Sequence, residues 1–433
     1  MTPLEYGIAG CVLLLVLLMS SMPVAFVMGI VGVAGFAAVI NPDAAMSMMS
    51  AELVSTFSSK SLTVIPLFVF MGQVAFHSGI SRRLFDAAYH WLGPLPGGMA
   101  MATVGACTGF GAICGSGPAT AATMASVALP EMKRYGYNME LATGSVAAGG
   151  SLGMLIPPSV VFICYGVLTE QSIGKLFIAG IVPGVLIALL FCATIYLRCL
   201  RRPKLGPVSP AFSWGRKVLA LAGVLETLLL FALVMGGLFG GFFTPTEAAA
   251  VGAAGSLIVA AARGGLTRKM LQRSLLETVR TSCMVLAIVA GAVIFSRFLA
   301  ITQIPTRLAA GLAGLPLPPW GIMATVILFY LAAGCFVDAL ALLLLTVPIF
   351  YPVVEGLGYD PVWFGVMIVV VTQMGVISPP VGVNVYVVSG IERDVPLHTI
   401  FRGALPFLAA LVVAAALLLA FPAITLFLPN LVE

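Results

Sequence analysis

Apolar runs, separated by short polar segments, fill almost the whole chain. A membrane-spanning helix needs about 20 consecutive apolar residues, and most of these runs reach that length. The pattern therefore predicts an all-α polytopic membrane protein, embedded in a lipid bilayer. Spans are expected at about 4–22, 23–41, 62–80, 138–168, 174–200, 217–241, 245–263, 281–300, 361–390 and 397–428.

Two further apolar stretches, at about 97–132 and 319–354, are too long for single spans. A straight helix of that length would measure about 50 Å, against a hydrocarbon core of about 30 Å. We therefore expect each stretch to fold back on itself as a re-entrant hairpin. The expected tips are "CGSGPATAATM" at Cys114–Met124, which is rich in glycine and hydroxyl residues, and "GCFVDALA" at Gly334–Ala341.

The two halves of the chain repeat each other at a constant offset of 222 residues. The sequence "MATV" at Met101–Val104 recurs at Met323–Val326, and the pair Pro157-Pro158 recurs as Pro379-Pro380. An offset that needs no gap indicates two copies of one structural unit.

The positions of Lys and Arg predict that these two copies are inverted. With the N-terminus outside, only Lys60, Lys175, Arg297 and Arg307 fall on the outer side, and the other seventeen of the 21 basic residues are cytoplasmic. Cytoplasmic loops carry such an excess of positive charge. The same topology places both termini outside, the first hairpin on the cytoplasmic side and the second on the outer side. Inverted-topology repeats with broken helices are typical of secondary transporters.

Composition excludes several other classes of protein. Hydrophobic residues make up 61% of the 433 residues and charged residues only 9%, whereas soluble domains carry about 25% charged residues. The net charge of +5 does not indicate nucleic-acid binding, because the basic residues lie in short loops. The chain contains no phosphate-binding GxxxxGK[ST] motif. If Ser116 were a catalytic nucleophile, it would need a histidine base within hydrogen-bond reach. The histidines of the chain are His77, His90 and His398, and they lie at helix ends or in loops. We therefore expect no enzyme.

The Pro-Pro pairs predict helix breaks at membrane depth. Proline lacks a backbone donor and clashes with the preceding turn, and irregular backbone in a membrane is tolerated where it lines a cavity. The helix that stops at Ile156 presents carbonyl oxygens, and the hairpin tip at Ser116 adds a hydroxyl. Such oxygen ligands favour a hard cation, which we take to be Na⁺, while the helix start after the prolines favours an anion such as a carboxylate.

Three acidic residues lie inside apolar segments, where an ionisable group indicates function by default. Asp338 stands at the second hairpin tip, at the position of Ser116 in the first, and we expect a role in a cation site. Glu247 follows Thr244 by three residues, as in a helix capping box. For Glu226, a polar contact between helices and a contact with a partner subunit are equally open.

Four segments together resemble the large membrane subunit of TRAP (tripartite ATP-independent periplasmic) transporters, the DctM-like family. They are "GSGPATAATMASVALPEM", "GGSLGMLIPPS", "FFTPTEAAAV" and "QMGVISPPVGVN". The resemblance implies the fold of the ion-transporter superfamily, with a scaffold and a mobile elevator domain. It implies Na⁺-driven uptake of an organic acid (a carboxylate) across the bacterial inner membrane. The implied partners are a soluble periplasmic substrate-binding protein and a small four-helix membrane subunit.

The resemblance also implies a division of the chain and a set of site residues. Scaffold helices and an arm occupy 1–93 and 217–315, transport parts occupy 94–200 and 316–433, and 201–216 is a cytoplasmic linker. The expected arm helices are about 44–60 and Thr267–Arg280. One sodium site is expected at Ser116, Gly117, Gly153 and Ile156, and the other at Gly334, Asp338, Gln373, Ile377 and Ser378. The substrate is expected near Thr120, Pro158, Ser159, Pro380 and Asn384.

A stand-alone Na⁺/dicarboxylate symporter of the same fold is the alternative. Such a symporter needs no binding protein, so transport without one distinguishes the two functions.

Cysteine labelling tests the inverted topology. A cysteine introduced into the linker as Val208→Cys, in a chain whose eight native cysteines are replaced, should face the cytoplasm. A membrane-impermeant maleimide should therefore leave it unmodified in intact cells and modify it after permeabilisation. Modification in intact cells would contradict the topology.

Overall fold

The structure is a computed structural model that describes residues 2–20, 22–209, 211–313 and 318–432. All regular elements within these residues are helices. The first half of the chain forms α1 (Pro3–Met19), α2 (Val24–Val39), α3 (Pro42–Ser58), η1 (Lys60–Thr63), α4 (Val64–His77), α5 (Ile80–Leu92), α6 (Gly98–Cys114), α7 (Gly117–Arg134), α8 (Met139–Ser151), η2 (Leu152–Met154), α9 (Val160–Thr169), α10 (Ile173–Arg201) and η3 (Pro203–Leu205). The second half forms α11 (Trp214–Ala222), α12 (Leu225–Phe239), α13 (Pro245–Ala262), α14 (Arg268–Thr302), α15 (Ile304–Ala313), α16 (Pro319–Gly334), α17 (Ala339–Gly356), α18 (Pro361–Gly375), α19 (Val383–Ile391), α20 (Leu397–Ala420) and α21 (Ala423–Val432).

Six of the described helical segments are long and apolar enough to cross a membrane, by length and composition alone. The number rises to seven if α11 and α12, which meet at an angle of 49°, count as one span. Shorter apolar helices, among them α1 and α2, account for further spans expected from the sequence. The prediction of an all-helical polytopic membrane protein is confirmed.

Each of the two long apolar stretches is divided into two helices, as the hairpin prediction requires. The first divides at Gly115 and Ser116, between α6 and α7. Gly115 has a φ of +64°, a left-handed conformation that suits glycine. The second stretch divides between α16 and α17, where the side chain of Asp338 accepts a hydrogen bond from the Leu340 backbone N–H and caps α17.

Both helices that carry a Pro-Pro pair are broken as predicted, although the first regular helix ends earlier than the expected Ile156. In the first half α8 ends at Ser151, and α9 begins at Val160. In the second half α18 ends at Gly375, and α19 begins at Val383. The peptide bond between the two prolines is cis in both breaks.

Several boundaries differ from the sequence prediction. The expected arm helix at 267–280 and the expected span at 281–300 form one continuous helix, α14, because this segment has no glycine or proline where the two were expected to part. The equivalent first-half segment is interrupted at Ser59, between α3 and α4. Helix α5 is amphipathic and lay outside the predicted spans.

Two acidic residues have structural partners. Glu226 of α12 accepts hydrogen bonds at 2.9 Å from Arg263, which directly follows α13, so a polar contact between these two helices is present. Glu247 forms the predicted capping box with Thr244: its backbone N–H donates to the Thr244 hydroxyl at 3.3 Å, and its carboxylate accepts from the Thr244 backbone N–H at 2.8 Å.

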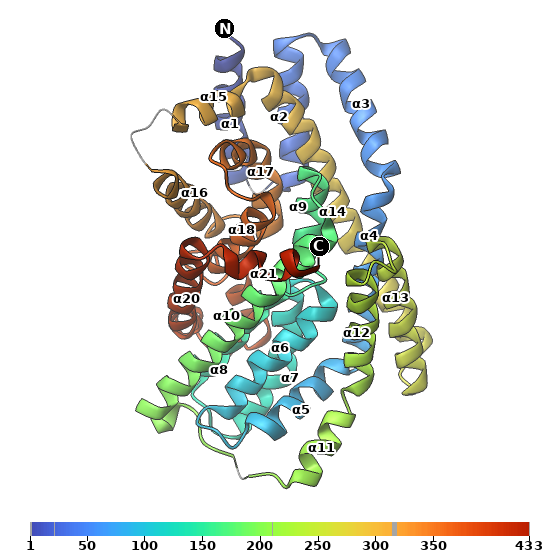
Figure 1. Cartoon of the computed structure of the whole chain (residues 1–433), viewed down its shortest axis with the longest axis vertical. Coiled ribbons are helices and arrows are strands. Elements are labelled where there is room, and N and C mark those ends of the chain that lie inside the picture. Colours follow the sequence, from blue (N-terminus) through green and yellow to red (C-terminus); the bar gives the residue numbers. More distant parts are fainter. Residues whose placement is uncertain (1, 21, 210, 314–317, 433) are drawn as a thin grey trace.

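The helices gather into two packed groups, which Figure 1 shows in sequence colours. In one group α14 packs against α2 and α4, and α4 packs against α13. In the other group α8 packs against α6, α7 and α20. Backbone approach is closest between α8 and α20, where a methyl group on Gly403 would lie 1.9 Å from the Glu140 carbonyl oxygen. Only glycine allows this contact, since any side chain would clash.

Candidate functional site

The first hairpin tip lies directly against the first helix break. A methyl group on Gly153, before the prolines, would lie 2.6 Å from the Thr120 hydroxyl oxygen and 2.9 Å from the Ser116 carbonyl oxygen. On the other side of the break, the Val160 backbone N–H donates to the Gly115 carbonyl oxygen at 3.4 Å. The tip is therefore placed between the two ends of the broken helix.

Hydrogen bonds at this first tip are short and local. The Ser116 carbonyl oxygen accepts from the Thr120 backbone N–H at 3.1 Å and from the Thr120 hydroxyl at 2.7 Å. The Ser159 hydroxyl donates to the Met154 carbonyl oxygen and also accepts from the Phe162 N–H, which caps α9. The structure thus brings Ser116, Gly153 and Thr120 together. Ile156 instead directs its side chain toward Gly184 of α10.

The second tip lies against the second break in a similar way. A methyl group on Gly375 would lie 2.4 Å from the Gly334 carbonyl carbon. The Val381 N–H donates to the Cys335 carbonyl oxygen at 3.3 Å, and the Ser378 hydroxyl donates to the Met374 carbonyl oxygen at 2.6 Å. In both halves, glycines allow a hairpin to approach the backbone of a broken helix.

Two buried amides in the second half have unpaired polar atoms. Neither the Oε1 nor the Nε2 atom of Gln373 has a hydrogen-bond partner, and the side chain is 0% exposed. Asn384 is also fully buried: its Nδ2 donates to the Ala147 carbonyl oxygen at 3.0 Å, while its Oδ1 is unpaired. An unsatisfied buried polar group costs about 1–3 kcal/mol. These oxygen atoms fit a site whose ligand would satisfy them.

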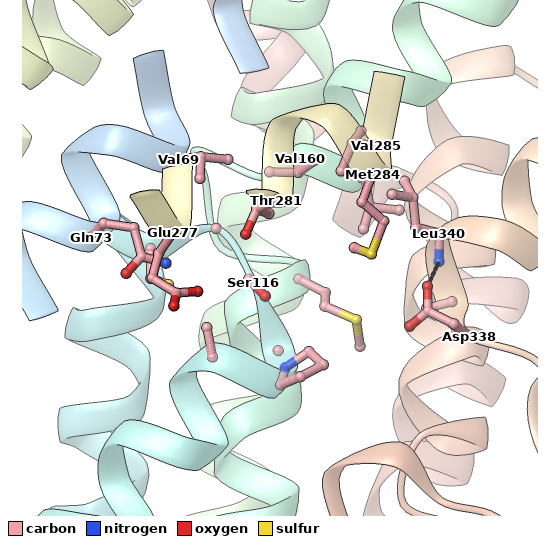
Figure 2. A pocket seen from close by; sticks show the side chains of 18 residues that line it. Val69, Gln73, Ser116, Val160, Glu277, Thr281, Met284, Val285, Asp338 and Leu340 are labelled. Carbon is pink, nitrogen blue, oxygen red and sulfur yellow. Dashed lines mark hydrogen bonds between the residues drawn. The ribbon is translucent and has the colours of Figure 1, made fainter. Parts of the chain in front are cut away.

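A cavity of about 360 Å³ lies between the two hairpin tips and the helices α4 and α14. Figure 2 shows Ser116 near its centre, with Gln73 and Glu277 on one side and Asp338 on the other. Its lining comprises Val69, Gln73, Cys114, Gly115, Ser116, Gly117, Pro118, Ala119, Met154, Val160, Val161, Glu277, Thr281, Met284, Val285, Asp338, Ala339 and Leu340.

Only part of the predicted site lines this cavity. The lining includes Ser116, Gly117 and Asp338, so the equivalent tip residues Ser116 and Asp338 share one cavity. The other predicted sodium-site residues are outside the lining: Gly334 lies at the second tip, and those at the two breaks are Gly153, Ile156, Gln373, Ile377 and Ser378. The five predicted substrate residues are also outside the lining: Thr120, Pro158, Ser159 and Asn384 are buried, and Pro380 is exposed.

Sequence reasoning missed three polar residues of this cavity. Gln73 comes from α4, and Glu277 and Thr281 come from α14. Glu277 was not among the candidate acids, because it stands among basic residues in a segment expected to lie at the membrane surface. The helical spacing of Glu277, Thr281 and Met284 was the available signal, since these residues share one face of α14.

The charge of the cavity restricts what it can bind. Within the described lining, Glu277 and Asp338 are acidic, and no Lys or Arg accompanies them. Two carboxylates without a cation attract positive ions and repel an anion. An organic anion in this space is repelled unless cations or protons neutralise the protein's own acids.

Comparison with known proteins identifies relatives along nearly the full chain. The family model described as "Tripartite ATP-independent periplasmic transporter, DctM component" matches residues 11–424. The C4-dicarboxylate TRAP transporter large permease protein DctM of Pseudomonas aeruginosa is 39% identical over 391 residues, which cover 90% of this chain and 91% of that protein. The sialic acid TRAP transporter large permease protein SiaM of Vibrio cholerae is 34% identical over 416 residues, covering 96% of each chain.

A solved structure supports the fold at lower identity. The YdaH transporter of Alcanivorax borkumensis superposes with a TM-score of 0.63 and 15% sequence identity, covering 97% of this chain and 98% of that one. Similarity at this level of identity concerns the fold alone.

The unpaired amide of Gln373 predicts a measurable effect on stability. Replacing it as Gln373→Leu removes two unsatisfied buried atoms, so in sodium-free buffer the melting temperature should stay equal or rise. The matched control is Thr372→Val, which removes a buried hydroxyl that donates to the Val369 carbonyl oxygen at 2.9 Å. The melting temperature of this control should not rise. Thermal unfolding in detergent measures the melting temperature of both variants. A clear fall in the melting temperature of Gln373→Leu alone would show that the amide has hydrogen-bond partners in the folded protein.

Proposed function

Because the chain belongs to the family of TRAP transporter large permease proteins, we propose that it imports an organic acid by coupling uptake to Na⁺. In this proposal it is a multi-pass permease of the bacterial inner membrane. It receives a carboxylate substrate from a periplasmic binding protein, and it works with a small four-helix membrane subunit. The named relatives are permeases.

The observation that best supports Na⁺ coupling is the chemistry of the tips and breaks. Broken helix ends, hydroxyls and unpaired amide oxygens supply oxygen ligands, which hard cations prefer. Glu277 and Asp338 add negative charge to the cavity between the tips. A carboxylate that enters this cavity needs cations beside it, and this requirement provides a physical reason for coupled transport.

The proposed ion sites follow the two tip-and-break contacts. One Na⁺ would be held by Ser116, Gly117, Gly153 and Ile156. The other Na⁺ would be held by Gly334, Asp338, Gln373, Ile377 and Ser378. Asp338 is the least direct member, because it faces the cavity while Gln373 is buried at the break. The unpaired Oε1 of Gln373 is the strongest single candidate ligand in the second site. The substrate would lie between the two tips.

We propose an elevator mechanism, in which each inverted repeat contributes a scaffold part and a transport part. The transport parts would move relative to the scaffold. Contacts within the proposed transport parts are polar as well as apolar. Lys133 of α7 forms ion pairs with Glu392 at 2.9 Å and Asp394 at 3.0 Å. The Tyr165 hydroxyl donates to the Pro361 carbonyl oxygen at 2.6 Å. Such contacts would join the two halves of the proposed transport unit. The proposed scaffold includes α14, which packs against α2 and α4, and α13, which packs against α4.

Substitution of Asp338 tests the coupling ion. Asparagine caps helices about as well as aspartate, so Asp338→Asn keeps the N-cap of α17 and removes only the charge. Because the variant removes a full negative charge beside the proposed ion, the sodium concentration for half-maximal uptake should rise more than about tenfold. Ser116→Ala removes a neutral ligand and should cause a smaller rise.

Uptake by reconstituted proteoliposomes at varied sodium concentration provides the measurement for both variants. Substrate affinity at saturating sodium should change little. If Asp338→Asn leaves the sodium dependence unchanged and weakens substrate binding alone, Asp338 is not a cation ligand, and the second site must be built from Gln373 and the neighbouring backbone.

Reconstitution with and without partners tests the proposed function as a whole. The permease and its small membrane subunit should take up organic acid only when a loaded binding protein and an inward sodium gradient are both present. Sodium-driven uptake of free substrate without any binding protein would favour the alternative, a stand-alone Na⁺/dicarboxylate symporter.

A further inference from the structure

A second cavity lies far from the hairpin tips, between α5 and α11. Its volume is about 490 Å³, and its lining comprises Arg83, Asp86, His90, Arg216, Leu219, Ala220 and Gly223. Figure 1 shows α11 at the lower end of the molecule, beyond α5. On α5 the lining residues Arg83, Asp86 and His90 are three and four residues apart, and on the other side Arg216 is followed by Leu219 and Ala220, three and four residues on, so each helix turns one face toward the groove. We refer to this cavity as the α5–α11 groove.

The groove carries cationic groups that lack partners. Nε and Nη2 of Arg83 are buried without a hydrogen-bond partner, although a guanidinium offers five donors. Arg216 is exposed, and none of the described ion pairs involves it or Arg83. Asp86 is the one acid of the lining, so two guanidinium groups outweigh it. The His90 ring adds a further potential donor.

Aromatic contacts fix the two helices around the groove. The indole N–H of Trp91 donates to the Lys217 carbonyl oxygen at 3.3 Å, and the rings of Trp91 and Trp214 meet edge to face at 6.0 Å. The Lys217 ammonium lies 5.7 Å from the Trp91 ring and 5.1 Å from the Trp214 ring. Trp and Lys at such positions are typical of the boundary between membrane and water.

We propose that the α5–α11 groove binds the phosphate headgroup of an anionic phospholipid. A phosphodiester accepts several hydrogen bonds and would satisfy the unpaired nitrogens of Arg83 together with Arg216. Basic pockets on the cytoplasmic side of membrane proteins bind such headgroups, and the distribution of Lys and Arg places this linker region on that side.

The exposed residues of α11 favour a lipid over a soluble phosphate. Leu219 lines the groove and is 74% exposed, and its neighbours Trp214 and Val218 are 72% and 62% exposed. Apolar side chains beside a cationic groove fit acyl chains attached to the headgroup, whereas a soluble phosphate would leave them in water. The lipid would touch α5, which packs on the first hairpin, and α11, which leads into α12.

Native mass spectrometry of the full-length chain, co-expressed with its proposed small membrane subunit, tests this assignment. Phosphatidylglycerol should bind more tightly than phosphatidylcholine, and the double variant Arg83→Gln/Arg216→Gln should weaken phosphatidylglycerol binding about tenfold or more. The variant Arg83→Lys/Arg216→Lys keeps the charge and should retain most of the preference. Arg201→Gln/Arg202→Gln removes the same charge from exposed residues of the same region and should bind as wild type.

Controls separate folding and ligand source from the proposal. Arg216→Gln alone changes an exposed side chain, so it should fold as wild type and still weaken phosphatidylglycerol binding; an unchanged affinity in this variant would contradict the assignment. Glycerol 3-phosphate serves as the soluble competitor and should not displace the lipid at millimolar concentration. Displacement would identify a soluble-anion site instead. Equal binding of phosphatidylglycerol and phosphatidylcholine would also overturn the proposal. So would a loss of phosphatidylglycerol affinity in Arg201→Gln/Arg202→Gln as large as that in Arg83→Gln/Arg216→Gln.

Discussion

Every polar group of the backbone must find a partner in a membrane, and the rest of this structure depends on how the chain meets that requirement at its two helix breaks. A break frees carbonyl and N–H groups where no bulk water can satisfy them. The chain places a hairpin tip against each break, so that Val160 donates to Gly115 in one half and Val381 donates to Cys335 in the other. The irregular backbone is thereby partly satisfied, and the remaining oxygens are available to a ligand.

Glycine makes these contacts possible. Gly153 beside the first tip and Gly375 beside the second stand where a methyl group would overlap the opposing backbone or side chain. Small residues let helices approach closely in membranes, where packing rather than water exclusion drives association. The family resemblance assigned Gly153 to one expected ion site and Gly334, which packs against Gly375, to the other. Their packing role is compatible with that expectation, since a ligand site built from backbone oxygens requires closely spaced backbones.

The cavity between the tips and the α5–α11 groove differ in the sign of their charge. The cavity holds two carboxylates, whereas the groove holds two guanidinium groups and one carboxylate. Within the described lining of the cavity there is no arginine or lysine that could pair with an organic anion. The groove shares no lining residue with the cavity.

The sequence alone determined the class of protein, the helix breaks and the tips, because apolar run length, the Pro-Pro pairs and the constant offset of 222 residues are local or periodic properties of the chain. Only the tertiary structure decided which residues share a cavity. Glu277 and Gln73 come from helices that are distant in sequence from the tips, and the continuity of α14 aims Glu277 toward Ser116. Likewise, nothing in the local pattern around Gln373 indicates that its amide is buried without a partner, because burial depends on packing between segments that are far apart in the chain.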